Sequence, residues 1–101
     1  MLEQMRSFLT VVKEGSLHRA AAQLRISPSA LSRQMQALEH ELGGRLLERR
    51  ATGVSPTAGG QALAKRMGAV LASYDLAVSD TRRVLGGETD QVRFAIVWLS
   101  V

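Results

Sequence analysis

The sequence predicts a mainly α-helical chain, in which three short helices and a β-hairpin precede one long helix. Apolar residues recur at helical spacing in four segments, a serine or threonine precedes three of these segments, and glycines follow three of them. The length of 101 residues suits one small domain, or one with a fragment of a second. With 46% apolar and 22% charged residues, the composition is that of a globular protein rather than a disordered tail.

Two amphipathic helices are expected at the start of the chain. The first covers residues 2–14 and ends at Gly15, and Ser16 is the expected N-cap of a shorter second helix over residues 17–24. Small alanines on the second helix let another helix approach closely. The apolar residues are Leu2, Met5, Phe8, Leu9 and Val12 on the first helix, and Leu17, Ala20, Ala21 and Leu24 on the second.

A third helix is expected over residues 28–42, after a tight connection formed by Arg25 and Ile26. Ser27-Pro28 is its start signal, because serine caps a helix and proline at the first position loses no hydrogen bond. Gly43-Gly44 ends the helix. Its expected apolar stripe is Leu31, Met35, Leu38 and Leu42, with Ser29, Ser32, Arg33 and Gln36 on the opposite side.

A β-hairpin is expected next, from two short extended segments at residues 46–48 and 54–56. The residues between them run from Arg49 and Arg50 through Thr52 to Gly53, which predicts a tip that carries positive charge.

The long helix is expected over residues 58–85, with Thr57 as its cap and Gly86-Gly87 at its end. Its apolar stripe runs over nearly four heptads, which favours a partner helix, most simply the same helix of a second chain. Packing within the chain against the first helix is the alternative. The predicted dimerisation residues are Leu63, Met67, Val70, Leu71, Tyr74, Ala77, Val78 and Val84, with Leu85 in an adjacent seam.

The chain changes character after Gly87, where residues 92–99 are rich in β-forming residues. A lone strand has no partner and no core to join, so we expect residues 87–101 to be a hinge and the first strand of a further domain. The expected organisation is a first domain over residues 1–58, a linker or dimerisation helix over 59–86, and the hinge and strand over 87–101.

Positive charge is concentrated in residues 1–66, which hold ten Lys and Arg against five Asp and Glu. A local basic excess points to a polyanion, most often nucleic acid, although a charge that serves only solubility is the alternative. The absence of cysteine excludes disulfides and thiolate metal sites. No apolar run or signal pattern indicates a membrane or export, so a soluble, cytoplasmic protein is expected.

The second and third helices have the spacing of a helix-turn-helix, whose second helix enters the DNA major groove by its N-terminal residues. That end also offers free N–H groups and a positive dipole to phosphates. The alternative interpretation of each arginine is a solvated surface charge, and that of Ser27 is a helix cap without a DNA contact. The histidines His18 and His40 lack metal-ligand spacing, so no metal or cofactor is expected. The candidate DNA contacts are His18, Arg19, Ser27, Pro28, Ser29, Ser32, Arg33, Gln36, Arg49 and Arg50.

The first 60 residues or so resemble the N-terminal region of LysR-type transcriptional regulators. The resemblance rests on Gly15-Ser16, Arg19-Ala20-Ala21, Ala30 to Gln34, Leu38-Glu39 and Leu46 to Arg49, in ungapped spacing. It implies a winged helix-turn-helix, a linker helix that forms the dimer, and a larger C-terminal domain that binds a small-molecule effector. It also implies base contacts by Pro28, Ser29, Ser32 and Arg33, and wing contacts by residues 49–53, hence by Thr52.

Two positions depart from the family pattern. Family members often carry Gln-Pro after the capping serine, where this chain has Pro28-Ser29, so a glutamine able to contact adenine is absent. The wing often has an arginine at the position of Thr52, whereas here the charge is at Arg50.

The leading interpretation is a sequence-specific transcriptional regulator that binds double-stranded DNA as a homodimer, or as a tetramer in the full-length protein. The alternative is a helical protein-interaction module whose basic face is incidental. An enzyme is not expected, because the sequence has no activated nucleophile, paired carboxylates or cofactor motif.

Overall fold

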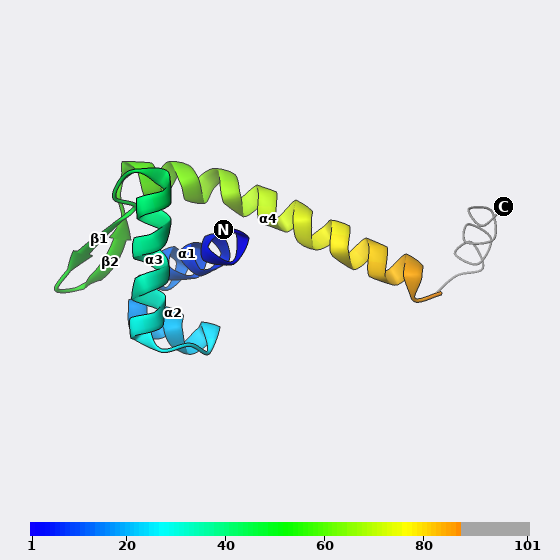
Figure 1. Ribbon diagram of the computed structural model, residues 1–101, viewed down its shortest axis with the longest axis horizontal. Helices are drawn as coiled ribbons and strands as arrows, with labels where there is room; N and C mark the ends of the chain where they lie inside the picture. The colour runs from blue at the N-terminus through cyan, green and yellow to red at the C-terminus, as the bar shows by residue number, and fades with distance from the viewer. Residues whose placement is uncertain (88–101) are drawn as a thin grey trace. The chain divides into compact units, whose positions relative to one another are not determined.

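The computed structural model describes residues 1–87 (Figure 1). Its elements are, in chain order, α1 (Leu2–Glu14), α2 (Leu17–Leu24), α3 (Pro28–Leu42), β1 (Leu47–Arg50), β2 (Gly53–Pro56) and α4 (Ala58–Leu85). The mainly α-helical class and all four helix ranges are therefore confirmed. The strand expected within residues 92–99 lies outside the described residues. Contacts divide the chain into two compact units, Met1–Ala69 and a second that begins at Val70.

Three side-chain oxygens cap the helices as the sequence predicts. Ser16 Oγ accepts a hydrogen bond from the N–H of Arg19 at 3.2 Å, and Ser27 Oγ accepts one from Ala30 at 3.1 Å. At the start of α4, Thr57 Oγ1 accepts the N–H of Gly60 at 3.1 Å. Each cap satisfies a donor that the first turn of a helix cannot pair internally.

The connection from α2 to α3 is closed by a residue that is not glycine. Arg25 has φ 60°, in the left-handed region, and its N–H reaches the carbonyls of Ala21 and Ala22. Ile26 donates to the carbonyl of Ala21 at 3.1 Å. This geometry costs an L-residue roughly 1 kcal/mol, but it turns the chain within three residues.

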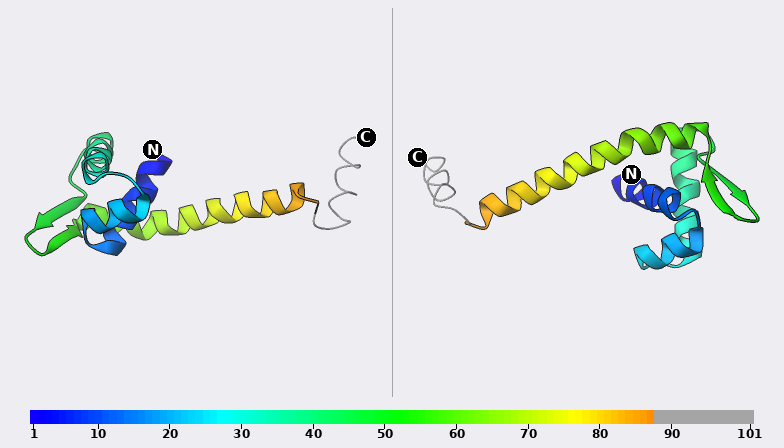
Figure 2. Two further views of the ribbon diagram at one scale, coloured as in Figure 1. Left: turned by 90° about the horizontal axis from the view of Figure 1, so that it is seen from below. Right: turned by 180° about the vertical axis from the view of Figure 1, so that it is seen from behind.

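The core of the first unit lies where α1, α2 and α3 pack against one another (Figures 1 and 2). Phe8, Val11, Leu31 and Leu38 are almost completely buried, and Ala20 and Ala21 allow α2 to approach closely. Two expectations need correction. Val11 rather than Val12 is the buried valine of α1, and Leu42 is 46% exposed because it lies in the last turn of α3, beyond the packed region.

The hairpin differs from the prediction in the length of its strands. The antiparallel register pairs Leu47 with Pro56 and Arg50 with Gly53. Pairing thus continues to the turn, and Gly53, at φ 136°, takes a backbone conformation that other residues rarely adopt. The prediction that residues 49–53 form the tip is therefore wrong in part. Arg49 and Arg50 belong to β1, and only two residues remain in the turn.

Hydrogen bonds tie the hairpin to the rest of the first unit and close its base. The N–H of Val54 donates to the carbonyl of Gly15 at 3.0 Å, and Thr57 donates to the carbonyl of Leu46 at 2.9 Å. The hydroxyl of Thr57 also donates to the carbonyl of Arg45 at 2.7 Å. Gly60 lies so near Leu46 that a Cβ atom added at Gly60 would overlap the carbonyl oxygen of Leu46.

Helix α4 is 28 residues long and ends where the two glycines follow. Within the second unit it carries large apolar side chains that are exposed in the single chain. These are Val70, Tyr74, Leu76, Val84 and Leu85. Across residues 1–87, no helix combines the length and the apolar character that crossing a membrane requires.

Candidate nucleic-acid interface

The N-terminal turn of α3 is open to a ligand. Ser27, Pro28 and Ser29 are all exposed, and the hydroxyls of Ser27 and Ser29 lie 3.2 Å apart. An exposed helix start presents unpaired backbone N–H groups and the positive end of the helix dipole. This end of α3 can therefore bind an anionic group or approach a base edge closely.

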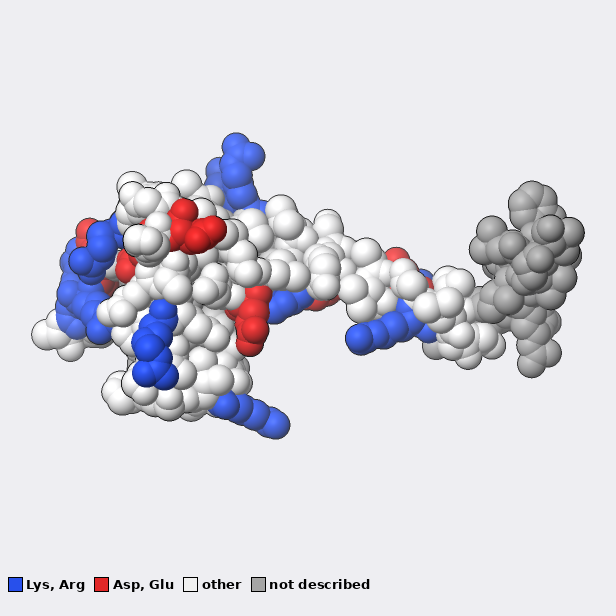
Figure 3. All heavy atoms as spheres, in the orientation of Figure 1, with Lys and Arg blue, Asp and Glu red and all other residues white. Residues whose placement is uncertain are grey.

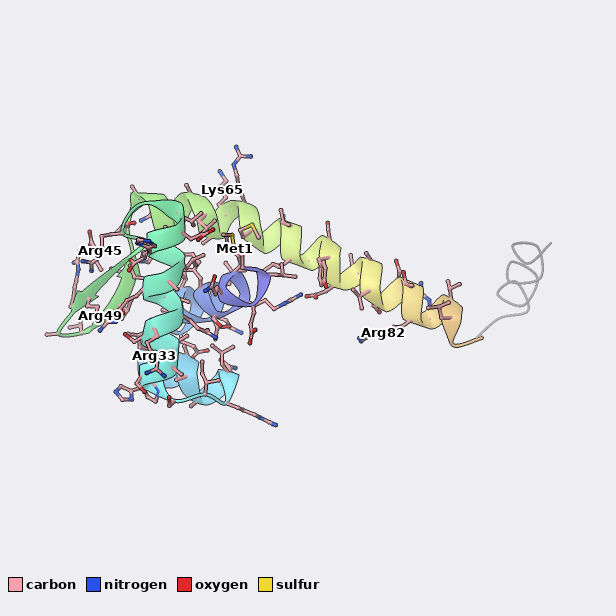
Figure 4. All side chains as sticks on the ribbon, in the orientation of Figure 1. Met1, Arg33, Arg45, Arg49, Lys65 and Arg82 are labelled. Carbon is pink, nitrogen blue, oxygen red and sulfur yellow. The ribbon has the colours of Figure 1, made fainter. Side chains whose placement is uncertain are left out.

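The polar face of α3 continues this surface. Arg33 and Gln36 are exposed and Ser32 is half-buried, on the side opposite the buried Leu31 and Leu38. Arg33 makes no hydrogen bond or ion pair within the described part of the chain, so its guanidinium is available to a partner. Figure 4 shows Arg33 on the N-terminal half of α3 and Arg49 on the neighbouring hairpin.

A hydrogen bond connects the hairpin to this face. Arg49 Nη2 donates to Ser32 Oγ at 2.7 Å, so the structure brings these two predicted site residues together. Arg50 is separated from them, because successive side chains of a strand point to opposite faces. It pairs instead with Glu48, two residues before it, at 3.1 Å. The two arginines predicted as one basic tip therefore serve different faces of the hairpin.

The predicted contacts on α2 lie at its exposed first turn. His18 is exposed, and Arg19 donates to the carbonyl of Glu14 at 2.6 Å, close to the carboxylate of the same residue at 3.9 Å. The guanidinium is thus held at the C-terminal end of α1, where the helix dipole favours a positive charge. With 66% of its side chain exposed, Arg19 still presents donors to solvent.

Glu39 has a structural role at this surface, and in the sequence it stands out only as part of the family pattern. Its Oε2 accepts hydrogen bonds from the N–H groups of Leu46 at 2.8 Å and Leu47 at 3.2 Å, and lies 3.6 Å from Arg45 Nε. The carboxylate therefore fixes the start of β1 against α3. The available sequence signal is weak, because an acidic residue late in a helix is usually solvated.

A groove of about 320 Å³ lies between α3 and β1. Its lining combines apolar and charged side chains, and the one carboxylate among them is the hydrogen-bonded Glu39. In Figure 3, Lys and Arg side chains gather over the hairpin, with another over α3. The groove is lined by Met35, Gln36, Glu39, Arg45, Leu47 and Arg49.

No group of three His, Cys, Asp or Glu side chains that could hold a metal ion occurs in the part of the chain that the structure describes.

The predicted dimerisation residues on α4 differ in their exposure. Leu71 is buried in the single chain at 4%, whereas Val70, Tyr74, Ala77 and Val84 are exposed. Leu63, Met67 and Val78 are half-buried. In the second unit a shallow hollow of about 370 Å³ is lined by Tyr74, Ala77, Val78, Thr81 and Arg82. The exposed Leu76 falls outside the heptad positions, which is why the periodicity missed it.

Comparison with proteins of known sequence gives relatives along nearly the whole chain. An uncharacterised transcriptional regulator of Escherichia coli K12, YnfL, is 38% identical over 92 residues, which are 91% of this chain and 31% of that protein. The regulator ClcR of Pseudomonas putida is 36% identical over the same share of each chain. The chain thus spans about a third of the length of these relatives. Both are named as helix-turn-helix-type transcriptional regulators.

Solved structures share the fold. The BenM DNA-binding domain, crystallised with catB site 1 DNA, superposes with a TM-score of 0.81 at 40% identity, covering 86% of this chain and 97% of that one. Full-length CbnR complexed with its target DNA gives a TM-score of 0.75 at 33% identity, covering 83% of this chain and 29% of that one. The family model for bacterial regulatory helix-turn-helix proteins of the lysR family matches residues 2–61. This chain, with its winged helix-turn-helix and long following helix, therefore belongs to the lysR family.

Proposed function

We propose that the chain is the DNA-binding and dimerisation part of a LysR-type transcriptional regulator. The observation that carries this proposal is the open N-terminal half of α3, whose polar face is linked to the hairpin by the bond between Ser32 and Arg49. A duplex can take such a helix in its major groove and the hairpin at the adjacent minor groove. BenM and CbnR, which share the fold, have been crystallised with DNA.

We infer the roles of individual residues from their positions. Ser29, Ser32, Arg33 and Gln36 face the base edges, while Ser27 and Pro28 bring the backbone of the first turn close to a phosphate. The contacts with phosphates and with the minor groove come from elements beside α3. His18 and Arg19 contact the phosphate backbone. Arg49, Arg50 and Thr52 provide the contacts of the wing.

Dimerisation through α4 completes the proposal. The apolar side chains of α4 that are exposed in the second unit would be covered by the same helix of a second chain. This would give a homodimer, or a tetramer in the full-length protein. Residues 1–58 would bind DNA, residues 59–86 would form the linker, and residues 87–101 would lead into a domain that binds a small-molecule effector.

Selection of bound duplexes from a random pool, followed by titration of the selected duplex across salt concentrations, tests the function. We expect one recognised sequence with two related half-sites. Affinity should fall on the order of a thousandfold between about 50 and 200 mM salt, because each phosphate contact releases counterions. Binding that is indifferent to salt and to sequence would contradict the proposal.

A pair of variants locates the surface. Arg33→Ala should weaken binding to the selected duplex by roughly 1–3 kcal/mol and relax the preference at one base pair. Lys65→Ala removes the same charge from a side chain that points away from α3 and the hairpin (Figure 4), so its effect should be much smaller. Equal effects of the two changes would place the interface elsewhere.

The exposed apolar residues of α4 also favour a second candidate, a helical interaction module with an incidental basic face. A chain that dimerises in sedimentation but binds no duplex in a salt-dependent way would support this candidate over the first.

A further inference from the structure

The bond between Arg49 and Ser32 has a fixed direction. A guanidinium has five N–H donors and no acceptor, so Ser32 Oγ must accept the bond of 2.7 Å. A hydroxyl that accepts in this way still has its own proton, which must point toward another acceptor. Because the donor is charged, it polarises the hydroxyl and strengthens it as a donor.

The proton of Ser32 has no acceptor in the described part of the chain. Serine and threonine in helices often donate to the carbonyl four residues earlier, as Thr10 does to Arg6 at 3.1 Å in α1. Within residues 1–87 Ser32 makes no such bond, and it lies on the polar face of α3 beside exposed residues. The proton is therefore available to a ligand on that face.

We propose that Arg49 sets the hydrogen-bond direction of Ser32, so that Ser32 acts toward DNA as a donor. This inference rests on the proposed function. A donor at this position selects base edges that carry an acceptor in the major groove, such as purine N7, guanine O6 or thymine O4. The charged donor of Arg49 occupies one of the two lone pairs of Ser32 Oγ and weakens the oxygen as an acceptor, so the amino groups of cytosine and adenine are disfavoured. Beyond its place on the wing, Arg49 is then a positioning residue that shapes base preference through Ser32.

Arg50 provides a matched control. It has the same charge, it is the next residue of β1, and it is exposed like Arg49. Its partner is the carboxylate of Glu48, however, and its side chain lies on the other face of the strand. Arg49→Met and Arg50→Met therefore remove equal charge, and only the first removes the donor to Ser32.

The experiment compares base preferences rather than overall affinity. The 101-residue chain and its Ser32→Ala, Arg49→Met and Arg50→Met variants each select duplexes from the same random pool, after thermal unfolding has confirmed that each variant is folded. We expect Ser32→Ala and Arg49→Met to lose about five- to tenfold in preference at the same base pair. Arg50→Met should keep that preference even where it lowers overall affinity, because Arg50 is itself a proposed wing contact but does not touch Ser32. The double variant should lose no more than Ser32→Ala alone.

Several results would overturn the inference. In one, Arg49→Met weakens binding evenly across sequences, as loss of a phosphate contact does. In another, Ser32→Ala keeps every base preference, or the double variant loses the product of the two single effects. Failure of the unmodified chain to select any sequence would instead refute the proposed function, so the two failures are distinguishable.

Discussion

Replacing Glu39 by alanine should release the start of β1 from α3 and lower the free energy of unfolding by about 2–3 kcal/mol. The carboxylate accepts two backbone N–H groups, from Leu46 at 2.8 Å and from Leu47 at 3.2 Å. Its side chain is only 17% exposed, so water replaces it imperfectly. A hydrogen bond to a charged group contributes roughly 1.5–3 kcal/mol, and the longer second bond adds less.

The ion pair with Arg45 contributes little to this sum. The two groups are 3.6 Å apart, and 73% of the Arg45 side chain is exposed to solvent. An exposed pair of this kind is worth up to about 1 kcal/mol. Glu39→Gln keeps an acceptor oxygen and should cost about 1 kcal/mol, and Arg45→Gln should cost no more than that. The expected order of destabilisation is therefore Glu39→Ala, then Glu39→Gln, then Arg45→Gln.

Urea denaturation followed by circular dichroism measures these differences, at one fixed protein concentration because a dimer would couple stability to concentration. Repeating the series at about 1 M salt separates the contributions, since salt screens the ion pair but not the shielded N–H bonds. The cost of Glu39→Ala should persist. If Arg45→Gln costs as much as Glu39→Ala, or if high salt removes the difference between them, the carboxylate acts through charge and the reasoning fails.

Four further changes test other parts of the structure. Gly60→Ala should lower stability by about 1–3 kcal/mol in thermal unfolding, because its Cβ would overlap the Leu46 carbonyl; Gly68→Ala, with nothing within 4 Å, should instead stabilise α4 by up to about 1 kcal/mol. Arg25→Gly should raise stability by about 0.5–1 kcal/mol, since glycine relieves the left-handed strain at φ 60°; a lower melting temperature would contradict this. Val70→Glu should shift sedimentation toward the monomer, and an unchanged dimer would place the interface elsewhere.

The helices could be predicted from the sequence because their determinants are local. Ser16, Ser27 and Thr57 each cap a donor three residues ahead, and Pro28 needs no donor at the first position of α3. Signals within one turn of the chain suffice for such elements. The start of α3, on which the candidate site depends, is set by one of these caps, whereas its exposure depends on how the helices pack.

The hairpin could be predicted only in outline, because its extent depends on pairing between strands. Nothing local to Arg49 and Arg50 shows that they pair with β2 rather than form a turn. Once the pairing is known, the alternation of a strand assigns the two side chains to opposite faces. The partners Ser32 and Glu48 then become evident, although the first lies 17 residues away in sequence.

The distance between α3 and the hairpin is likewise set by groups that sequence patterns do not display. The carbonyl of Gly15 fixes β2, the carboxylate of Glu39 fixes the start of β1, and Thr57 fixes the segment that precedes it. The turn after α1, the helix α3 and the cap of α4 thus share in holding the hairpin. In the proposed complex with DNA, a hairpin anchored on several sides has little freedom to adapt, so a variation in groove width must be met by deformation of the DNA. Base pairs between the two contacted grooves should therefore influence affinity even where no side chain touches them.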